Sequence, residues 1–362
     1  MTVDRADPGS VNTLPAVDAR PGEVITVDSS SRPAGIRPKR WEHTVHEVVA
    51  EVWRGDFLES LHHGTVYAAR PGGETVLSIG DVDRPMYPRS SNKPIQALGM
   101  LRAGLDLDGE LLALACASHS GESFHLDGVR RILEGAGLTT EALRCTAALP
   151  IGEDALRSYL ADGGVPTPLT MNCSGKHAAM LATCVVNGWD TETYLDPEHP
   201  LQRSLRATLE DLAGEKVAST GVDGCGAPLF AVSCRGLAKA FATLATGEAG
   251  SLEHRVARAM NSHPEYVGGT GRDVTRLMRA LPGSVAKDGA EGVYAVALPD
   301  GSAAVLKIAD GSQRARPVVM MAALRRLGID TKADETLDSM STAPVLGHGK
   351  PVGAVRPAGR LR

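Results

Sequence analysis

The sequence predicts a mixed α/β (α+β) protein in which helices flank a central antiparallel sheet. Three observations support this fold class. Strand-type segments come first, helical segments fill the middle of the chain, and a hairpin followed by a helix lies near the C-terminus. Because runs of strands and helices are separated rather than alternating, the sheet is expected to be antiparallel and built from both ends of the chain.

The first segment, residues 1–40, contains Asp28-Ser29-Ser30-Ser31, Pro33 and Pro38 and has no sustained periodicity, so it is predicted to be an unstructured extension. A catalytic domain is expected over residues 41–330. It opens with strand patterns at 45–52, 65–69 and 75–79, the last two joined across a Pro-Gly-Gly turn, and together they predict an antiparallel meander.

A helix is expected to begin near Ser91 or Asn92 and to run through Leu101, because apolar residues recur with helical spacing and Pro94 suits a first turn. The apolar run 111–117 is predicted to be a buried strand that ends in small polar residues. Further helices are predicted at 124–136, 175–187, 200–213, 235–246, 251–261 and 271–280.

Near the C-terminus, residues 292–298 and 303–308 flank Pro-Asp-Gly-Ser, which predicts a hairpin. A helix is expected from about 315 to 327. The remaining residues, 331–362, are polar with scattered Gly and Pro, and are expected to form a tail that packs only in part.

Composition and net charge exclude several classes of binding partner. The net charge is −5 and the sequence pI is about 6.1, which argues against a nucleic-acid binder. No apolar run approaches ~18 residues, so no membrane partner is expected. The 6 cysteines are too loosely spaced for a disulfide framework, so a reduced, cytoplasmic protein is expected.

Two segments carry candidate nucleophiles. Ser90 and Lys93 form Ser-x-x-Lys at a loop-to-helix junction, where a neutral lysine amine can accept the serine proton. This short pattern also occurs at Ser284–Lys287, and Ser90 can equally be a helix N-cap. In the second segment, Ser118 precedes His119, a possible base or hydrogen-bond donor; the alternative is a turn in which Glu122 closes a capping box.

Two further segments carry possible metal ligands. Cys173 and His177 fall in one, and Asp223 and Cys225 in the other. Thiols, imidazole and carboxylate are zinc ligands, but the spacing is not that of a C-x-x-C site. The alternative is that the cysteines are small buried apolar residues, as most free cysteines are.

The chain contains, in this order, the strings RSSNKPIQALGML, ALACASHSGE, MNCSGKHAAML, DGCGAP and VLKIADG. Together these strings resemble the rhizobial-type L-asparaginases (asparaginase II, class 3). The resemblance covers about residues 45–328. It implies a fold similar to the serine β-lactamases and glutaminases, with a central antiparallel sheet. It also implies two Ser–Lys tandems, which fall here on Ser90–Lys93 and Ser118–Lys287.

The resemblance further implies a zinc site at Cys173, Lys176 and Cys225, with Asp223 nearby holding a water. Lysine is an unusual metal ligand because it must lose its proton. In the family, the metal resembles an aid to substrate binding more than a source of the nucleophile.

The expected reaction is hydrolysis of L-asparagine to L-aspartate and ammonia. Ser90 would attack the amide carbon while Lys93 takes its proton, and Ser118 would act with Lys287 as a relay or supply the nucleophile itself. The expected substrate-binding residues are Arg89, Arg272 and Asp223, the two arginines because guanidinium groups bind carboxylates bidentately. A homodimer is the default expectation for an enzyme of this size.

Two alternatives remain open. A serine acyl-transferase of the β-lactamase or penicillin-binding kind also uses S-x-x-K, but the S-D-N and K-T-G strings that accompany it do not occur here. A non-catalytic zinc- or amino-acid-binding protein would keep the cysteines but need no Ser–Lys pair. Preference for asparagine over glutamine rests on one methylene and is not predicted.

Overall fold

The computed structural model describes residues 45–362, so the predicted extension over 1–40 lies outside the described residues. Within this range, eight strands form one sheet in the order β6-β7-β8-β2-β1-β10-β9, with β3 paired to β2. The strands are β1 (Glu47–Arg54), β2 (Phe57–Ala69), β3 (Thr75–Ile79), β6 (Val285–Gly289), β7 (Val293–Ala297), β8 (Ala303–Ile308), β9 (Ala343–Gly347) and β10 (Lys350–Pro357). A separate small pair consists of β4 (Thr220–Val222) and β5 (Pro228–Phe230).

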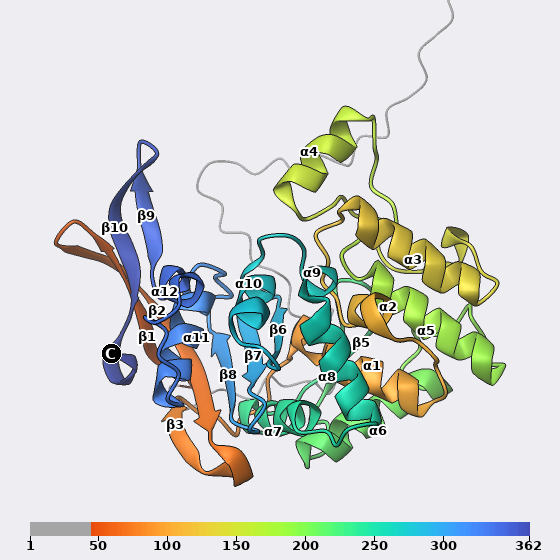
Figure 1. The fold of residues 1–362 in the computed structure, drawn as a ribbon, viewed down its shortest axis with the longest axis horizontal. Helices are drawn as coiled ribbons and strands as arrows, with labels where there is room; N and C mark the ends of the chain where they lie inside the picture. Colours follow the sequence, from red (N-terminus) through yellow and green to blue (C-terminus); the bar gives the residue numbers. More distant parts are fainter. Residues whose placement is uncertain (1–44) are drawn as a thin grey trace, which may run out of the picture. The chain divides into compact units, whose positions relative to one another are not determined.

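The sheet confirms the predicted fold class. Its strand pairs are antiparallel, and β2 from the first part of the chain pairs with β8 from the last part, with Tyr67 opposite Val305. The sheet is therefore made from both chain ends, and it is flanked by helices (Figure 1). The predicted hairpin over 292–308 is present as β7 and β8.

The C-terminal prediction is wrong in one respect. Residues 343–357 are only partly packed, as expected, but they form β9 and β10 instead of an irregular tail, and β10 pairs with β1 along Ala50–Arg54. They therefore belong to the same sheet as the strands of the predicted catalytic domain. The sequence is misleading here because β9 is the edge strand, β10 lies next to it, and the two strands bury few side chains, among them Val345 and Val355.

The helices of the described range are α1 (Lys93–Arg102), α2 (Gly109–Ala115), α3 (Ser123–Gly135), α4 (Glu153–Ala161), α5 (Ser174–Asn187), α6 (Pro200–Ala213), α7 (Cys234–Ala245), α8 (Leu252–Ser262), α9 (Pro264–Val267), α10 (Asp273–Ala280), α11 (Ala315–Arg326) and α12 (Glu335–Met340). No helix in residues 45–362 has the length and apolar character needed to cross a bilayer.

Each predicted helix matches one of these to within one or two residues. Local signals explain the agreement: α6 begins at Pro200, and both α5 and α6 end at a glycine in the left-handed region, Gly188 and Gly214. The strand predicted at 111–117 is wrong, because this run belongs to α2, which starts after the N-cap Asp108. A short apolar run has no periodicity that separates a buried strand from a buried helix.

Helices cover the central strands. The strands β6, β7 and β8 are almost completely buried, α7 packs on β7 and β8, and α11 packs on β8, β2 and β10. The hairpins β1–β2 and β9–β10 extend away from this core at the left of Figure 1.

The sheet end at β6 meets the start of α1 through a short 3-10 turn, η3 (Arg89–Asn92). The Ser91 hydroxyl donates to the Lys287 carbonyl at 3.0 Å. Gly289 allows this approach, because a Cβ there would lie 2.7 Å from the Pro88 oxygen. This contact holds the segment that carries Ser90 against the strand that carries Lys287.

Candidate active site

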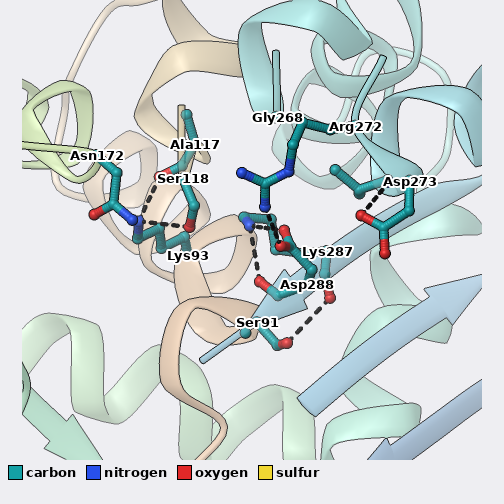
Figure 2. A network of polar contacts seen from close by, with 12 residues as sticks. Ser91, Lys93, Ala117, Ser118, Asn172, Gly268, Arg272, Asp273, Lys287 and Asp288 are labelled. Carbon is teal, nitrogen blue, oxygen red and sulfur yellow. Dashed lines mark hydrogen bonds and ion pairs between the residues drawn. The ribbon is translucent and has the colours of Figure 1, made fainter. Parts of the chain in front are cut away.

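A cavity of about 420 Å³ opens where η3, β6, α10 and the loop after α2 meet. Both candidate serines line it. Its lining residues are Ser90, Ser118, Ile151, Asn172, Arg272, Asp288, Gly289, Ala290, Gln313 and Arg316. Figure 2 shows Ser118 with buried polar side chains gathered around it from separate parts of the chain.

Ser90 lies in η3 and is half-buried. It is not the helix N-cap: α1 is capped by Asn92, and without a side-chain bond. Its hydroxyl has no hydrogen-bond partner among residues 45–362. The preceding residue, Arg89, has a φ of 51°, a conformation that non-glycine residues seldom adopt and that is often found at functional sites.

Lys93 contacts Ser118 rather than Ser90. Its Nζ donates to Ser118 Oγ at 3.0 Å, lies 3.0 Å from Cys173 Sγ and also donates to the Ala117 carbonyl (Figure 2). The side chain is 1% exposed. Three acceptors around one amine match the three N–H groups of an ammonium.

Lys287 is also fully buried, but its amine has two acceptors instead of three. Nζ donates to the carbonyl of Asp288 at 2.8 Å and to its Oδ1 at 2.5 Å, and no bond to Ser118 is present in the described range. Burial lowers the pKa of Lys287 to about 8, with Lys93 and Arg272 adding to the effect and Asp288 opposing it. Two donated bonds leave one position of the amine without an acceptor, so the neutral form, which predominates above a pH of about 8, keeps a lone pair there to accept a proton.

Asp288 joins this lysine to two arginines. Its Oδ2 accepts from Arg272 at 2.8 Å and lies 3.4 Å from Arg316. Burial by itself would raise the pKa of Asp288, but Lys287, Arg316 and Arg272 hold it well below its usual range. Arg316 also pairs with Asp273 at 2.8 Å.

The sequence analysis missed Asp288 and Arg316. A signal was available for each. Asp288 follows Lys287 in β6, between the apolar pair Val285-Ala286 and the apolar strand β7, and Arg316 interrupts the apolar face of α11. Ionised residues within buried segments are seldom tolerated unless they are paired.

The other predicted substrate-binding residues pair with each other. Arg89 Nε donates to Asp223 Oδ1 at 2.8 Å, and a second nitrogen of Arg89 lies 3.8 Å from Glu291. Neither Arg89 nor Asp223 is among the cavity-lining residues, whereas Arg272 is. This ion pair links the backbone beside Ser90 to the loop that carries Cys225.

The predicted zinc ligands lie close together. Lys176 Nζ is 3.2 Å from Cys225 Sγ, and a hydrogen bond from the Cys173 thiol lowers the pKa of Cys225. Burial opposes the charge on Lys176, but Cys225, Cys173 and Asp223 raise its pKa, so a metal would have to displace its proton. Residues 45–362 contain no group of three or more His, Cys, Asp or Glu side chains placed to hold a metal.

The contacts of His119 allow the predicted role of hydrogen-bond donor, whereas the capping box predicted for Glu122 is wrong. His119 Nε2 bonds to Ser174 Oγ at 2.8 Å, and burial lowers the pKa of this histidine well below its usual value. Glu122 accepts from the Thr270 N–H instead of closing a capping box.

No curated protein matches the chain. Among solved structures it is similar to Mglu in its native form, at 17% identity and TM-score 0.40, over 74% of this chain but only 64% of the length of Mglu. It is also similar to a β-lactamase from Mycobacterium bovis, at 15% identity and TM-score 0.41 over 74% of this chain and 95% of that one. EstCE1, a hydrolase with promiscuous acyltransferase activity, matches at 14% identity and TM-score 0.40, over 72% of this chain and 93% of that one.

The match to a family model covers more of the chain. The model of the L-asparaginase II family aligns with residues 50–357, which include all eight strands of the sheet at least in part and every residue of the site described above. The chain therefore belongs to the L-asparaginase II family.

Proposed function

We propose that this protein hydrolyses the side-chain amide of L-asparagine to L-aspartate and ammonia through a serine ester. Membership of the L-asparaginase II family supports amidohydrolase activity. The observation that carries the finer proposal is the arrangement at Ser118, whose hydroxyl lines the cavity beside Ser90 and is held by the buried amine of Lys93.

Ser90 is the proposed nucleophile. Its hydroxyl has no partner among the described residues, faces the cavity and is less buried than that of Ser118, which is 5% exposed. It also lies beside the N-terminus of α1, where free N–H groups and the helix dipole favour negative charge on an oxyanion.

The proton route departs from the one expected from the sequence. Lys93 already donates to Ser118 Oγ, so we assign it the role of a charged donor that orients this hydroxyl. As the Ser90 Oγ–carbon bond forms, the Ser90 proton passes to Ser118, and the Ser118 proton passes to the neutral amine of Lys287. In Figure 2, Lys93 and Lys287 are seen on opposite sides of Ser118, and the hydrogen bond drawn to the Ser118 hydroxyl is that of Lys93.

The remaining steps reverse this transfer. The proton held by Lys287 returns through Ser118 to the departing nitrogen, the carbon–nitrogen bond breaks and ammonia leaves. Water then attacks the aspartyl ester, and its proton passes through Ser118 to Lys287. The proton returns to Ser90 Oγ as the ester bond breaks, which releases L-aspartate and free Ser90. Arg272 and Arg316 line the cavity and are the proposed partners of the substrate carboxylate.

We also propose that zinc binds at Cys173, Cys225 and Lys176, since two sulfurs and an amine are donors that this ion accepts. When bound, it would supply a positive charge beside the cavity that favours substrate binding. Among the chain's own residues, Asp223 is placed to orient a water there, because its Oδ2 lies 4.0 Å from Cys225 Sγ.

The test is ammonia release from L-asparagine and L-glutamine by the purified protein and by two serine variants. Ser90→Ala should lower kcat by roughly 10³-fold or more, because no ester can form. Ser284→Ala is the matched control: this serine also lies in an S-x-x-K string and its hydroxyl also has no partner among the described residues, but it is outside the cavity.

The outcomes separate the possibilities. Loss of activity in Ser90→Ala but not in Ser284→Ala supports the proposal. Full activity in Ser90→Ala keeps the hydrolase assignment and moves the nucleophile to Ser118. No ammonia from either substrate, with or without added zinc, contradicts asparagine hydrolysis.

A further inference from the structure

The cavity has an unequal distribution of charge. Two arginines, Arg272 and Arg316, line it, and two buried lysines, Lys93 and Lys287, lie behind its serines. Asp288 is the only acidic side chain among the lining residues that the structure describes. A substrate in this cavity therefore meets mainly cationic groups.

Asp288 is not free to bind a substrate cation. Its Oδ1 accepts from Lys287 at 2.5 Å, and its Oδ2 accepts from Arg272 at 2.8 Å with Arg316 at 3.4 Å. The residue is only 4% exposed. Both oxygens are engaged by the chain's own cations, so the negative charge of Asp288 is already compensated.

The neighbouring acids are engaged elsewhere. Asp223 pairs with Arg89 at 2.8 Å and does not line the cavity. Glu291 directly follows the cavity-lining residue Ala290. Its side chain is exposed and lies 3.8 Å from Arg89. Asp273 pairs with Arg316 at 2.8 Å. Among residues 45–362, the one carboxylate that lines the cavity is therefore that of Asp288, and its charge is compensated by the chain's own cations.

We propose that the site recognises the carboxylate of its substrate and does not recognise the α-ammonium group. The protein is then an amidohydrolase for ω-monoamides of short dicarboxylic acids, with succinamate, which is asparagine without its amino group, as a further substrate. This inference rests on the proposed function, because it uses the same cavity and the same serine.

The physical reason is an asymmetry in what each substrate group loses. A carboxylate that leaves water gains charge-assisted bonds from guanidinium groups. An ammonium in the same cavity loses hydration and gains no anionic partner, so its removal costs little. In contrast, a site built to bond a polar group rejects the analogue that lacks it by about 10⁴–10⁵-fold.

The experiment compares kcat/KM of the wild-type protein on three amides by ammonia release. L-Asparagine carries both charged groups, succinamate carries only the carboxylate, and β-alaninamide carries only the ammonium. We expect succinamate to lie within about tenfold of L-asparagine, and β-alaninamide to fall at least about 100-fold below both, a difference that reflects the loss of charge-assisted bonds.

Each result decides between distinct conclusions. If L-asparagine is hydrolysed and succinamate is slower by 10³-fold or more, the inference is overturned while the proposed function stands. If β-alaninamide is as good as succinamate, carboxylate recognition is overturned. If succinamate is hydrolysed and L-asparagine is not, the inference stands and the proposed substrate is wrong. If no amide is hydrolysed, both are wrong.

Discussion

Replacement of Asp288 by asparagine tests the electrostatic account of this site most directly. The carboxylate is 4% exposed and compensates three cations, with Lys287 at 2.5 Å, Arg272 at 2.8 Å and Arg316 at 3.4 Å. Asparagine keeps the shape of the side chain but removes its charge. Removing one partner of a buried ion pair typically costs about 3–5 kcal/mol, so we expect the free energy of unfolding to fall by that amount at pH 7.

The loss should depend on pH. The negative charge of Asp288 raises the pKa of Lys287, so the pKa of this lysine should fall below about 8 in the variant. Between the two pKa values the folded variant binds fewer protons than the folded wild type. Its stability relative to wild type therefore rises with pH until the wild-type lysine is also neutral, by about 1.4 kcal/mol for each unit that separates the two pKa values.

Urea unfolding followed by tryptophan fluorescence at pH 6, 7, 8 and 9 measures this difference. Asp127→Asn is the matched control, because Asp127 forms an exposed i,i+3 pair with Arg130, and we expect a change below about 0.5 kcal/mol. A loss under about 1 kcal/mol for Asp288→Asn at pH 7, or a loss that grows with pH, would refute the reasoning.

Four further outcomes are expected. Ser118→Ala should lower kcat by about 10²-fold or more with little change in KM, because a relay acts in the transition state; an unchanged kcat would remove Ser118 from the route. In wild type, kcat/KM should rise through pH of about 8 as Lys287 becomes neutral, and a flat profile from pH 6 to 9 would contradict its role as proton acceptor. Gly289→Ala places a Cβ 2.7 Å from the Pro88 oxygen and should cost about 1–3 kcal/mol in urea unfolding, whereas Gly135→Ala, which meets no atom within 4 Å, should not destabilise. Dialysis against a chelator should raise KM and leave kcat nearly unchanged; a matching loss of kcat would show that the metal takes part in the chemistry.

Helices could be predicted from the sequence because their signals are local. Each signal lies within one or two helical turns of the residue it affects. Examples are the apolar spacing, Pro200 at the start of α6, and Gly188 and Gly214 at the ends of α5 and α6. The hairpin at β7–β8 was equally accessible, since Asp300 and Gly301 form its turn. The strands β9 and β10 were not, because β10 joins the sheet by pairing with β1, which lies about 300 residues away in the chain.

The candidate site likewise has features that could be predicted from the sequence and features that could not. The sequence by itself determined which residue types were present: two serines, two lysines and two cysteines within short strings typical of one family. Which serine meets which lysine was decided only by tertiary structure, and Lys93 bonds to Ser118, 25 residues away, instead of to Ser90 one helical turn before it. Asp288 and Arg316 acquire their roles only when β6 and α11 bring them together. The physical reason is that motif spacing constrains neighbours along the chain, whereas burial, which sets both the charge of Lys287 and the need to compensate it, depends on what the rest of the chain packs around it.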